Sequence, residues 1–187
     1  MAAMTDYLVL LRGINVGGRN KVPMAALKTL LTELGFKNVT TYIQSGNAML
    51  RSPLKADTVA KKIEKGIVSA FKLDSEIIRV LALSHKQFKA IVDDRPKGFG
   101  DEPKKYHSDA IFMMGISVKE AMPAFSPLEG VDVLWPGKGV VYSQRLSAKR
   151  TKSRLNRVMS SPLYQSMTIR SWSTTLKLLD LLGKEEA

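Results

Sequence analysis

The sequence lacks cysteine entirely and contains only two histidines, His85 and His107, among its 187 residues. The absence of cysteine excludes disulfide bonds and thiolate metal sites. A zinc site would have to join the two histidines to scattered carboxylates, and no ligand spacing in the chain supports such a site. We therefore predict neither a metal site nor a bound cofactor.

Long apolar segments are absent as well. The run from Tyr7 to Leu11 is cut by Arg12, far short of the about 20 apolar residues that span a membrane. Residues 1–6 carry no basic region of a signal peptide. We expect a cytoplasmic protein that does not bind membranes. The apolar share of 44% and charged share of 25% are those of a globular chain, and the length suits one domain or two small ones.

Carboxylates are missing from one long segment of the chain. None occurs between Val133 and Leu179, where nine lysines and arginines do. The net charge of +12 lies in two parts, with +6 in residues 1–83 and +6 in residues 145–187, while residues 84–144 are neutral. A basic segment without acids attracts polyanions and phosphorylated metabolites. The simpler alternative is that these lysines and arginines lie on an ordinary solvated surface and bind no partner.

The apolar periodicity of residues 1–83 predicts the order β-α-β-β-α-β. The expected elements are a strand at 7–11, a helix with Pro23 at its first position and Gly35 at its end, strands at 39–44 and 48–50, a helix at 56–71 and a strand at 77–83. This is the split βαβ, or ferredoxin-like, order. Right-handed crossovers then place both helices on one face of a four-stranded antiparallel sheet.

The second half of the chain echoes this order. Ser84 is expected to cap a short helix that ends near Asp93, and an irregular segment, residues 93–108, follows. The later elements are expected as a strand at 110–114, a helix at 118–125, paired strands at 131–135 and 140–142, a basic helix at 147–159 and a last helix at 173–182 ended by Gly183. We predict an α+β fold of two ferredoxin-like (α/β plait) units packed together, with extra C-terminal helices. Its parts are residues 1–83, a connection at 84–108 and residues 109–187.

A glycine-rich basic loop follows the first strand. It is neither the G-x-x-x-x-G-K-[ST] nor the G-x-G-x-x-G phosphate-binding pattern. Val22 is a poor N-cap, so we expect the first N–H groups of the next helix to remain free for an anion. The candidate ligand-binding residues are Arg12, Asn15, Gly17, Gly18, Arg19 and Lys21, with Gln44, Ser45 and Asn47 from the next turn. The alternative is that glycine and asparagine only serve the geometry of tight turns.

The C-terminal basic segment supplies a second candidate set. On the expected helix at 147–159, Arg150, Arg154 and Arg157 would line one stripe and repel one another, which favours a counter-anion. Arg170 would stack on Trp172 or clamp a carboxylate or phosphate, whereas core packing is the alternative for the tryptophan. The candidate anion-binding residues are Arg145, Lys149, Arg150, Arg154, Arg157, Arg170 and Trp172.

No catalytic constellation is recognisable, and whether the protein is an enzyme is left open. The chain has no G-x-S-x-G motif. The run Tyr106-His107-Ser108-Asp109 holds groups that transfer protons, but adjacent residues of a strand point to opposite faces. We predict no catalytic residues.

Three blocks of the sequence carry a family resemblance. They are the run from Arg12 to Pro23, the pair Thr41-Tyr42 with the turn Gln44-Ser45-Gly46-Asn47, and the C-terminal pieces Ser153-Arg154-Leu155-Asn156 and Ile169-Arg170-Ser171-Trp172-Ser173-Thr174. The chain resembles a bacterial family known only as domain-of-unknown-function family 1697. The resemblance implies paired α/β-plait units and no assigned activity. It also implies a departure, because asparagines usually flank the tryptophan where this chain has Ser171 and Ser173.

Two functional hypotheses remain. The first is a protein that binds a small phosphorylated or carboxylated ligand at the glycine-rich loop, where neutral amides stand beside cations. The alternative is a salt-dependent module for RNA or single-stranded nucleic acid, which would bind through charge. It has no RNA-recognition-motif stacking platform, because residues 48–51 contain no aromatic side chain. The sequence does not identify protein partners.

Overall fold

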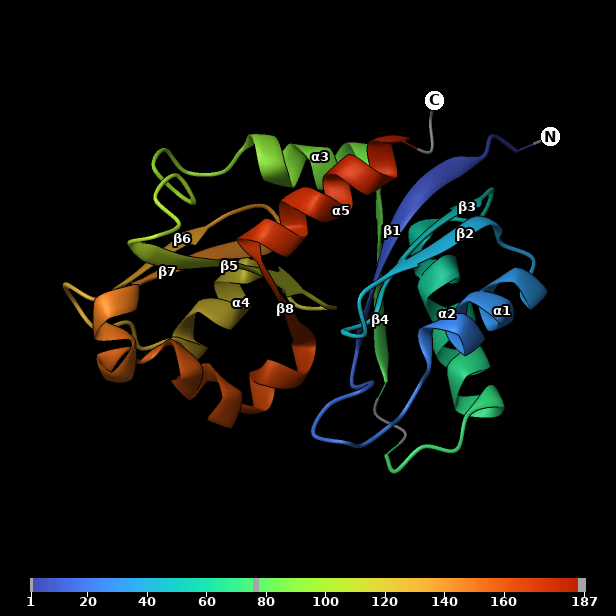
Figure 1. Ribbon diagram of the computed structural model, residues 1–187, viewed down its shortest axis with the longest axis horizontal. Helices are drawn as coiled ribbons and strands as arrows, with labels where there is room; N and C mark the ends of the chain where they lie inside the picture. The colour runs from blue at the N-terminus through green and yellow to red at the C-terminus, as the bar shows by residue number, and fades with distance from the viewer. Residues whose placement is uncertain (1, 76–77, 185–187) are drawn as a thin grey trace. The chain divides into compact units, whose positions relative to one another are not determined.

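The computed structural model describes residues 2–75 and 78–184 and has an α+β fold with two four-stranded antiparallel sheets (Figure 1). The chain divides into two compact units. Unit 1 comprises Met1–Lys89 and Leu178–Ala187, and unit 2 comprises Ala90–Lys177. Two helices, α3 (His85–Asp93) and α5 (Trp172–Lys184), contain residues of both units.

Unit 1 has the element order β-α-β-β-α-β. Its elements are β1 (Thr5–Arg12), α1 (Met24–Glu33), β2 (Lys37–Tyr42), β3 (Asn47–Ser52), α2 (Ala56–Ala70) and β4 (Arg79–Ser84). The strands lie in the order β2-β3-β1-β4, and every neighbouring pair is antiparallel. The strand expected at 77–83 begins with Ile77, which lies outside the described residues, and β4 is described from Arg79.

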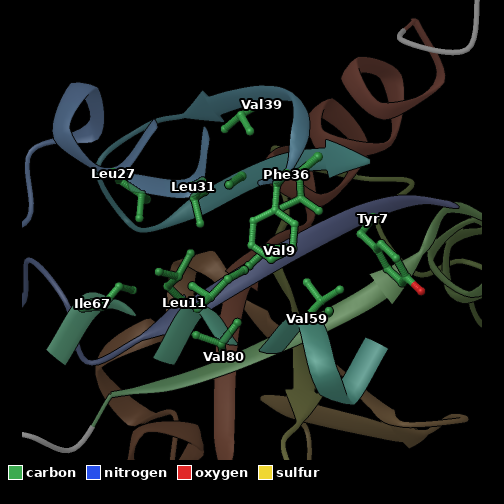
Figure 2. Packing of buried hydrophobic residues seen from close by; sticks show 14 of the residues in the cluster. Tyr7, Val9, Leu11, Leu27, Leu31, Phe36, Val39, Val59, Ile67 and Val80 are labelled. Carbon is green, nitrogen blue, oxygen red and sulfur yellow. The ribbon is translucent and has the colours of Figure 1, made fainter. Parts of the chain in front are cut away.

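The core of unit 1 lies between its sheet and the two helices, which cover the same face (Figure 1). Alternate residues of β1, Val9 and Leu11, point towards this core, where they join Leu31 of α1 and Ile67 of α2 (Figure 2). Each fully buried aliphatic side chain of this kind contributes about 1.5–3 kcal/mol relative to exposure. The helices therefore bury one face of β1, which pairs with β3 and β4 on its two sides.

The ends of α1 follow local chemistry. Leu34 is the C-cap residue, and Gly35 follows it with a φ of +92°. The N–H of Gly35 donates to the carbonyl of Thr32 at 3.0 Å and that of Phe36 to Leu31 at 3.2 Å, which is a Schellman motif. The helix start differs from expectation, because Pro23 occupies the N-cap, outside the helix, rather than its first position.

Unit 2 repeats the strand order of unit 1. Its elements are β5 (Tyr106–Met113), α4 (Val118–Ala121), the 3-10 helix η1 (Met122–Ala124), β6 (Asp132–Pro136), β7 (Val140–Leu146), the 3-10 helices η2 (Ser147–Lys152), η3 (Leu155–Ser160) and η4 (Pro162–Ser166), and β8 (Met167–Ser171). The sheet order is β6-β7-β5-β8, again antiparallel throughout. One face packs Ile111 and Met113 of β5 against Phe125 and Val158.

The prediction of one basic helix at 147–159 is wrong. This stretch forms η2 and η3, separated by Ser153 with a ψ of 141°, and Lys149 also departs from helical geometry. The charge spacing that suggested a helix was overridden by tertiary hydrogen bonds, as often happens to local propensity. The strand β8 was not predicted. Gly183 lies inside α5 rather than ending it, because α5 continues to Lys184.

The segment between α3 and β5 is anchored by aromatic packing. Phe99 is fully buried, with its ring centroid 4.9 Å from that of Trp172 and 5.3 Å from that of Tyr142. A Cβ atom on Gly100, where φ is +77°, would lie 2.6 Å from Nε1 of Trp172, so only glycine fits. Trp172 is therefore a core residue of unit 2.

We expect Tyr142→Phe to lower the free energy of unfolding by about 1–2 kcal/mol at neutral pH, because the buried carbonyl of Ile91 loses the Tyr142 hydroxyl that donates to it at 2.5 Å. Burial also raises the pKa of Tyr142 from 10.0 to about 12, with a smaller contribution from Asp94. The folded protein thus keeps a proton that the unfolded chain loses. Stability should fall as the pH rises from about 10 to about 12, and this component should vanish in the variant.

Urea unfolding at several alkaline pH values measures both effects. Tyr42→Phe, at a half-buried residue of β2, is the matched control. Equal alkaline profiles for the wild type and Tyr142→Phe would contradict the prediction.

Candidate anion-binding site

The loop after β1 forms a small β-hairpin, which we call the glycine finger (residues 15–20). Val16 and Arg19 form an isolated bridge, and the N–H of Arg19 donates to the carbonyl of Val16 at 2.9 Å. The two central residues, Gly17 and Gly18, have φ values of +57° and +75°. Positive φ at both positions is the geometry of a type I′ turn, which accounts for the glycine pair.

Asn15 fixes the finger to two neighbouring segments. Its side-chain Nδ2 donates to the carbonyls of Val22 at 2.9 Å and Gln44 at 3.0 Å. Its Oδ1 accepts from the N–H of Val22 at 2.8 Å. The amide of Asn15, predicted as a ligand contact, is therefore occupied by backbone partners.

Asn20 closes the other side of the finger and is almost completely buried. Its Nδ2 donates to the carbonyl of Gly13 at 2.8 Å, and its Oδ1 accepts from the N–H groups of Asp74 at 2.7 Å and Ser75 at 3.0 Å. Sequence analysis did not select this residue. A signal was present, since asparagine is among the few non-glycine residues that tolerate positive φ, here +47°.

The glycine finger and the end of β1 both lie beside the turn between β2 and β3, where Asn15 of the finger donates to the carbonyl of Gln44. The N–H of Leu11 donates to the carbonyl of Gly46 at 2.8 Å. A Cβ atom on Gly46 would lie 3.0 Å from Cβ of Leu11, so the two segments are in direct contact. Asn47 is buried and donates through Nδ2 to the carbonyl of Tyr42 and to Oγ of Ser45, each at 3.0 Å. The predicted loop and turn thus share one end of the first sheet.

Cations project from this end of the sheet. Arg19 and Lys21 are exposed, and Arg12 is half-buried directly opposite Arg79 in the pairing of β1 with β4. Asp74 adds a carboxylate among the described residues, since it accepts a hydrogen bond from the N–H of Asn20 at 2.8 Å. We call the group of Arg12, Arg19, Lys21 and Arg79 the basic end.

The N-cap residue of α1 differs from the predicted one. Val22 is not the N-cap, and its N–H donates to Asn15. The N-cap is Pro23, which makes no side-chain hydrogen bond to the helix. Among the residues that the structure describes, no side chain caps this helix end.

In unit 2 the basic segment is organised by a buried carboxylate. Asp132 accepts from the hydroxyl of Ser153 at 2.6 Å and from the N–H groups of Arg154 at 2.8 Å and Leu128 at 2.9 Å. These bonds draw the chain inwards at Ser153. The exposed cations therefore lie on separate short turns rather than on one helical stripe, and they are Lys149, Arg150, Lys152, Arg154 and Arg157.

Arg170 and Trp172 do not belong with these exposed cations. Arg170 is buried, and its Nη1 donates to Oγ1 of Thr168 at 2.8 Å and to the carbonyl of Ile169 at 2.9 Å. Burial lowers the pKa of Arg170. Ser171 acts at the start of α5, where its Oγ accepts from the N–H of Thr174 at 3.2 Å. A serine hydroxyl in this position suits a helix N-terminus.

Sequence analysis missed one polar pair in unit 2. His107 and Asp109 stand two residues apart on β5, so they share a face, and Nε2 of His107 lies 3.1 Å from the Asp109 carboxylate. Arg145 faces His107 across the β5–β7 pair, and its buried Nε has no hydrogen-bond partner among the described residues. Burial raises the pKa of Asp109 above 3.8, while His107 and Arg145 partly offset this rise.

Within residues 2–75 and 78–184, no group of three or more histidine, aspartate or glutamate side chains could hold a metal ion. Over the same residues, no helix has both the length and the apolar composition needed to cross a bilayer.

We expect Asn20→Ala to lower the free energy of unfolding by about 3 kcal/mol, since the backbone groups of Gly13, Asp74 and Ser75 lose their almost completely buried partner. Asn20→Gly keeps the positive φ without strain and should lose nearly as much. Gln44→Ala, at an exposed side chain, should change stability by less than about 0.5 kcal/mol. Urea unfolding measures all three, and a wild-type midpoint for Asn20→Gly would contradict the assigned role.

Asp109→Asn should flatten the pH dependence of stability in the acid range. Because folding raises the pKa of Asp109 above 3.8, the folded protein keeps a proton that the unfolded chain has released. Stability therefore falls as the pH rises from the pKa of the unfolded chain to the higher pKa of the folded protein. Asparagine has no such proton. Unfolding measured at several pH values from about 4 upwards tests this, with the exposed Asp101→Asn as control. Equal slopes in the wild type and Asp109→Asn would refute it.

Comparison with known proteins agrees with the resemblance. The model of the family described as "Protein of unknown function (DUF1697)" matches residues 4–142, which include the glycine finger and the adjoining turn. The solved structure of the conserved bacterial protein SP0830 from Streptococcus pneumoniae is 28% identical, covers 96% of this chain and 99% of that chain, and has a TM-score of 0.81. No curated protein matches the chain. With most of its length matched by the family model, the chain belongs to the DUF1697 family.

Proposed function

We propose that the protein binds the phosphate backbone of a nucleic acid through the basic end of unit 1. The observation that carries this proposal is which side chains of the site are occupied and which are exposed. The amides of Asn15 and Asn47 are occupied by internal hydrogen bonds, while Arg19 and Lys21 project into solvent. Long exposed cations bind phosphate by charge, with little demand for a shaped cavity.

The small-ligand hypothesis loses part of its support from the same hydrogen bonds. It relied on neutral amides standing beside cations, which would orient one particular ligand. Asn15 would have to break its bonds to Val22 and Gln44 before it could contact a ligand. A phosphodiester backbone needs no such amide contacts.

The exposed cations of unit 2 support the same proposal. Lys149, Arg150, Lys152, Arg154 and Arg157 lie within an acid-free stretch of the sequence. Asp132 is buried and its oxygens already accept three hydrogen bonds, so it does not act as an exposed counter-charge. Because each phosphate contact releases counterions, these cations give unit 2 its own salt-dependent attraction for a phosphate backbone.

The fold assignment forms part of this proposal. The order β2-β3-β1-β4 with both helices on one face is that of a ferredoxin-like plait, and we assign both units to it, with residues 84–108 as the connection between the two sheets. RNA-recognition motifs of this topology stack bases on aromatic residues of the sheet. Here Tyr7 is buried and β3 has no aromatic residue, so binding would depend on charge. A nucleic-acid ligand also suits a cytoplasmic location.

Fluorescence anisotropy with a labelled single-stranded RNA of about 20 nucleotides tests the proposal at about 50 and about 200 mM salt. Affinity should fall steeply with salt. The double variant Arg19→Ala and Lys21→Ala should weaken binding and reduce the salt slope by about 0.7 for each phosphate that the variant no longer neutralises. Lys28→Ala with Lys61→Ala, exposed cations on α1 and α2, is the matched control.

Three outcomes would overturn the proposal. The first is no binding at low salt, and the second is an equal effect of the two double variants. The third is a thermal shift with inorganic pyrophosphate or a mononucleotide that persists at high salt and disappears with Arg19→Ala and Lys21→Ala, because this result would restore the small-anion hypothesis.

A further inference from the structure

Unit 1 contains a groove between α1 and α2 that the proposed function does not use. Its volume is about 530 Å³, which lies within the range of about 300–1,000 Å³ typical of small-molecule sites. The lining is mostly apolar, with Leu30 and Leu34 from α1 and its C-cap and Gly66 and Ala70 from α2. We call this feature the α1–α2 groove.

Gly66 gives the groove its shape. A Cβ atom at this position would lie 2.9 Å from Cδ1 of Leu34. The two helical segments therefore approach closely because residue 66 has no side chain. A larger residue would push the flexible end of Leu34 into the open volume.

Two lysines add positive charge to the apolar lining. Lys62 and Lys65 are exposed, and none of the residues that line the groove is acidic. The Nζ atom of Lys62 lies 5.6 Å from the centroid of the Phe36 ring, within the range of a cation–π interaction. This contact restricts the lysine, whose aliphatic stem covers apolar surface while its charge stays in water.

We propose that the α1–α2 groove binds a single-chain amphiphile with a carboxylate head, such as a medium-chain fatty acid. The alkyl chain would lie on Leu30, Leu34 and Ala70, and the carboxylate would meet Lys62 and Lys65. Charge complementarity selects this ligand class, because an apolar surface beside two cations matches a chain that ends in one anion. The site is separate from the basic end and does not depend on the proposed function.

Isothermal titration calorimetry with dodecanoate, kept below its aggregation concentration, tests the site on the full chain. Dodecanoate should bind with 1:1 stoichiometry, and dodecyltrimethylammonium, which has the same alkyl chain and the opposite charge, should not bind. Lys62→Gln with Lys65→Gln should weaken dodecanoate binding by about tenfold or more through loss of charge-assisted hydrogen bonds. Lys61→Gln with Lys72→Gln removes the same charge from exposed positions outside the groove and should leave affinity unchanged.

Gly66→Ala provides a second, independent variant. Alanine favours the interior of a helix over glycine, so this variant should fold with an unchanged or higher melting temperature. Because its Cβ displaces Leu34 into the groove, dodecanoate affinity should fall at the same time.

The proposal fails if dodecanoate does not bind, or if dodecyltrimethylammonium binds equally well. It also fails if neither Gly66→Ala nor the Lys62/Lys65 variant weakens binding, since the ligand would then occupy another surface. A groove that takes up only an acidic peptide, and no dodecanoate, would overturn it as well.

Discussion

The hydrogen bonds of Asn15 and Asn20 hold together segments of unit 1 that no regular secondary structure joins. Where β1 ends, the backbone N–H and C=O groups of the following loop lose their ladder partners, and buried groups of this kind need replacements. The two asparagine amides supply them, from Gly13 to Val22 within the loop and as far as Gln44 and Ser75 outside it. The orientation of the glycine finger, and hence of Arg19 and Lys21, depends on these bonds.

Unit 2 uses a carboxylate for a comparable purpose. Asp132 can only accept hydrogen bonds when ionised, and it meets N–H and O–H donors at the junction of two 3-10 helices. The donors to its oxygens are a hydroxyl and backbone N–H groups, and none of these three bonds comes from a charged side chain. The cations of the neighbouring turns stay exposed, so the buried acid and the basic surface coexist within one short stretch.

Local sequence patterns predicted unit 1 well, because its helices and strands follow their own periodicity. Gly35 ends α1 as expected, and the order of elements from β1 to β4 is the predicted one. The sequence pattern gave a wrong prediction at 147–159. The arginine spacing suggested a helix there, but Ser153 and Arg154 donate hydrogen bonds to Asp132 and the helix is interrupted. The pattern also overlooked the pairing of His107 with Asp109, because we considered adjacent rather than alternate residues of the strand.

By itself the sequence determined the family, the element order of residues 1–83 and the position of the positive charge, since motifs, periodicity and composition are properties of neighbouring residues. Only the tertiary structure decided which candidate side chains remain available to a ligand. Asn15 and Asn47 read as ligand contacts in the sequence, yet their amides bind the protein's own backbone. The bond from Asn20 to Asp74 spans 54 positions, and such a contact forms only when folding brings the two residues together.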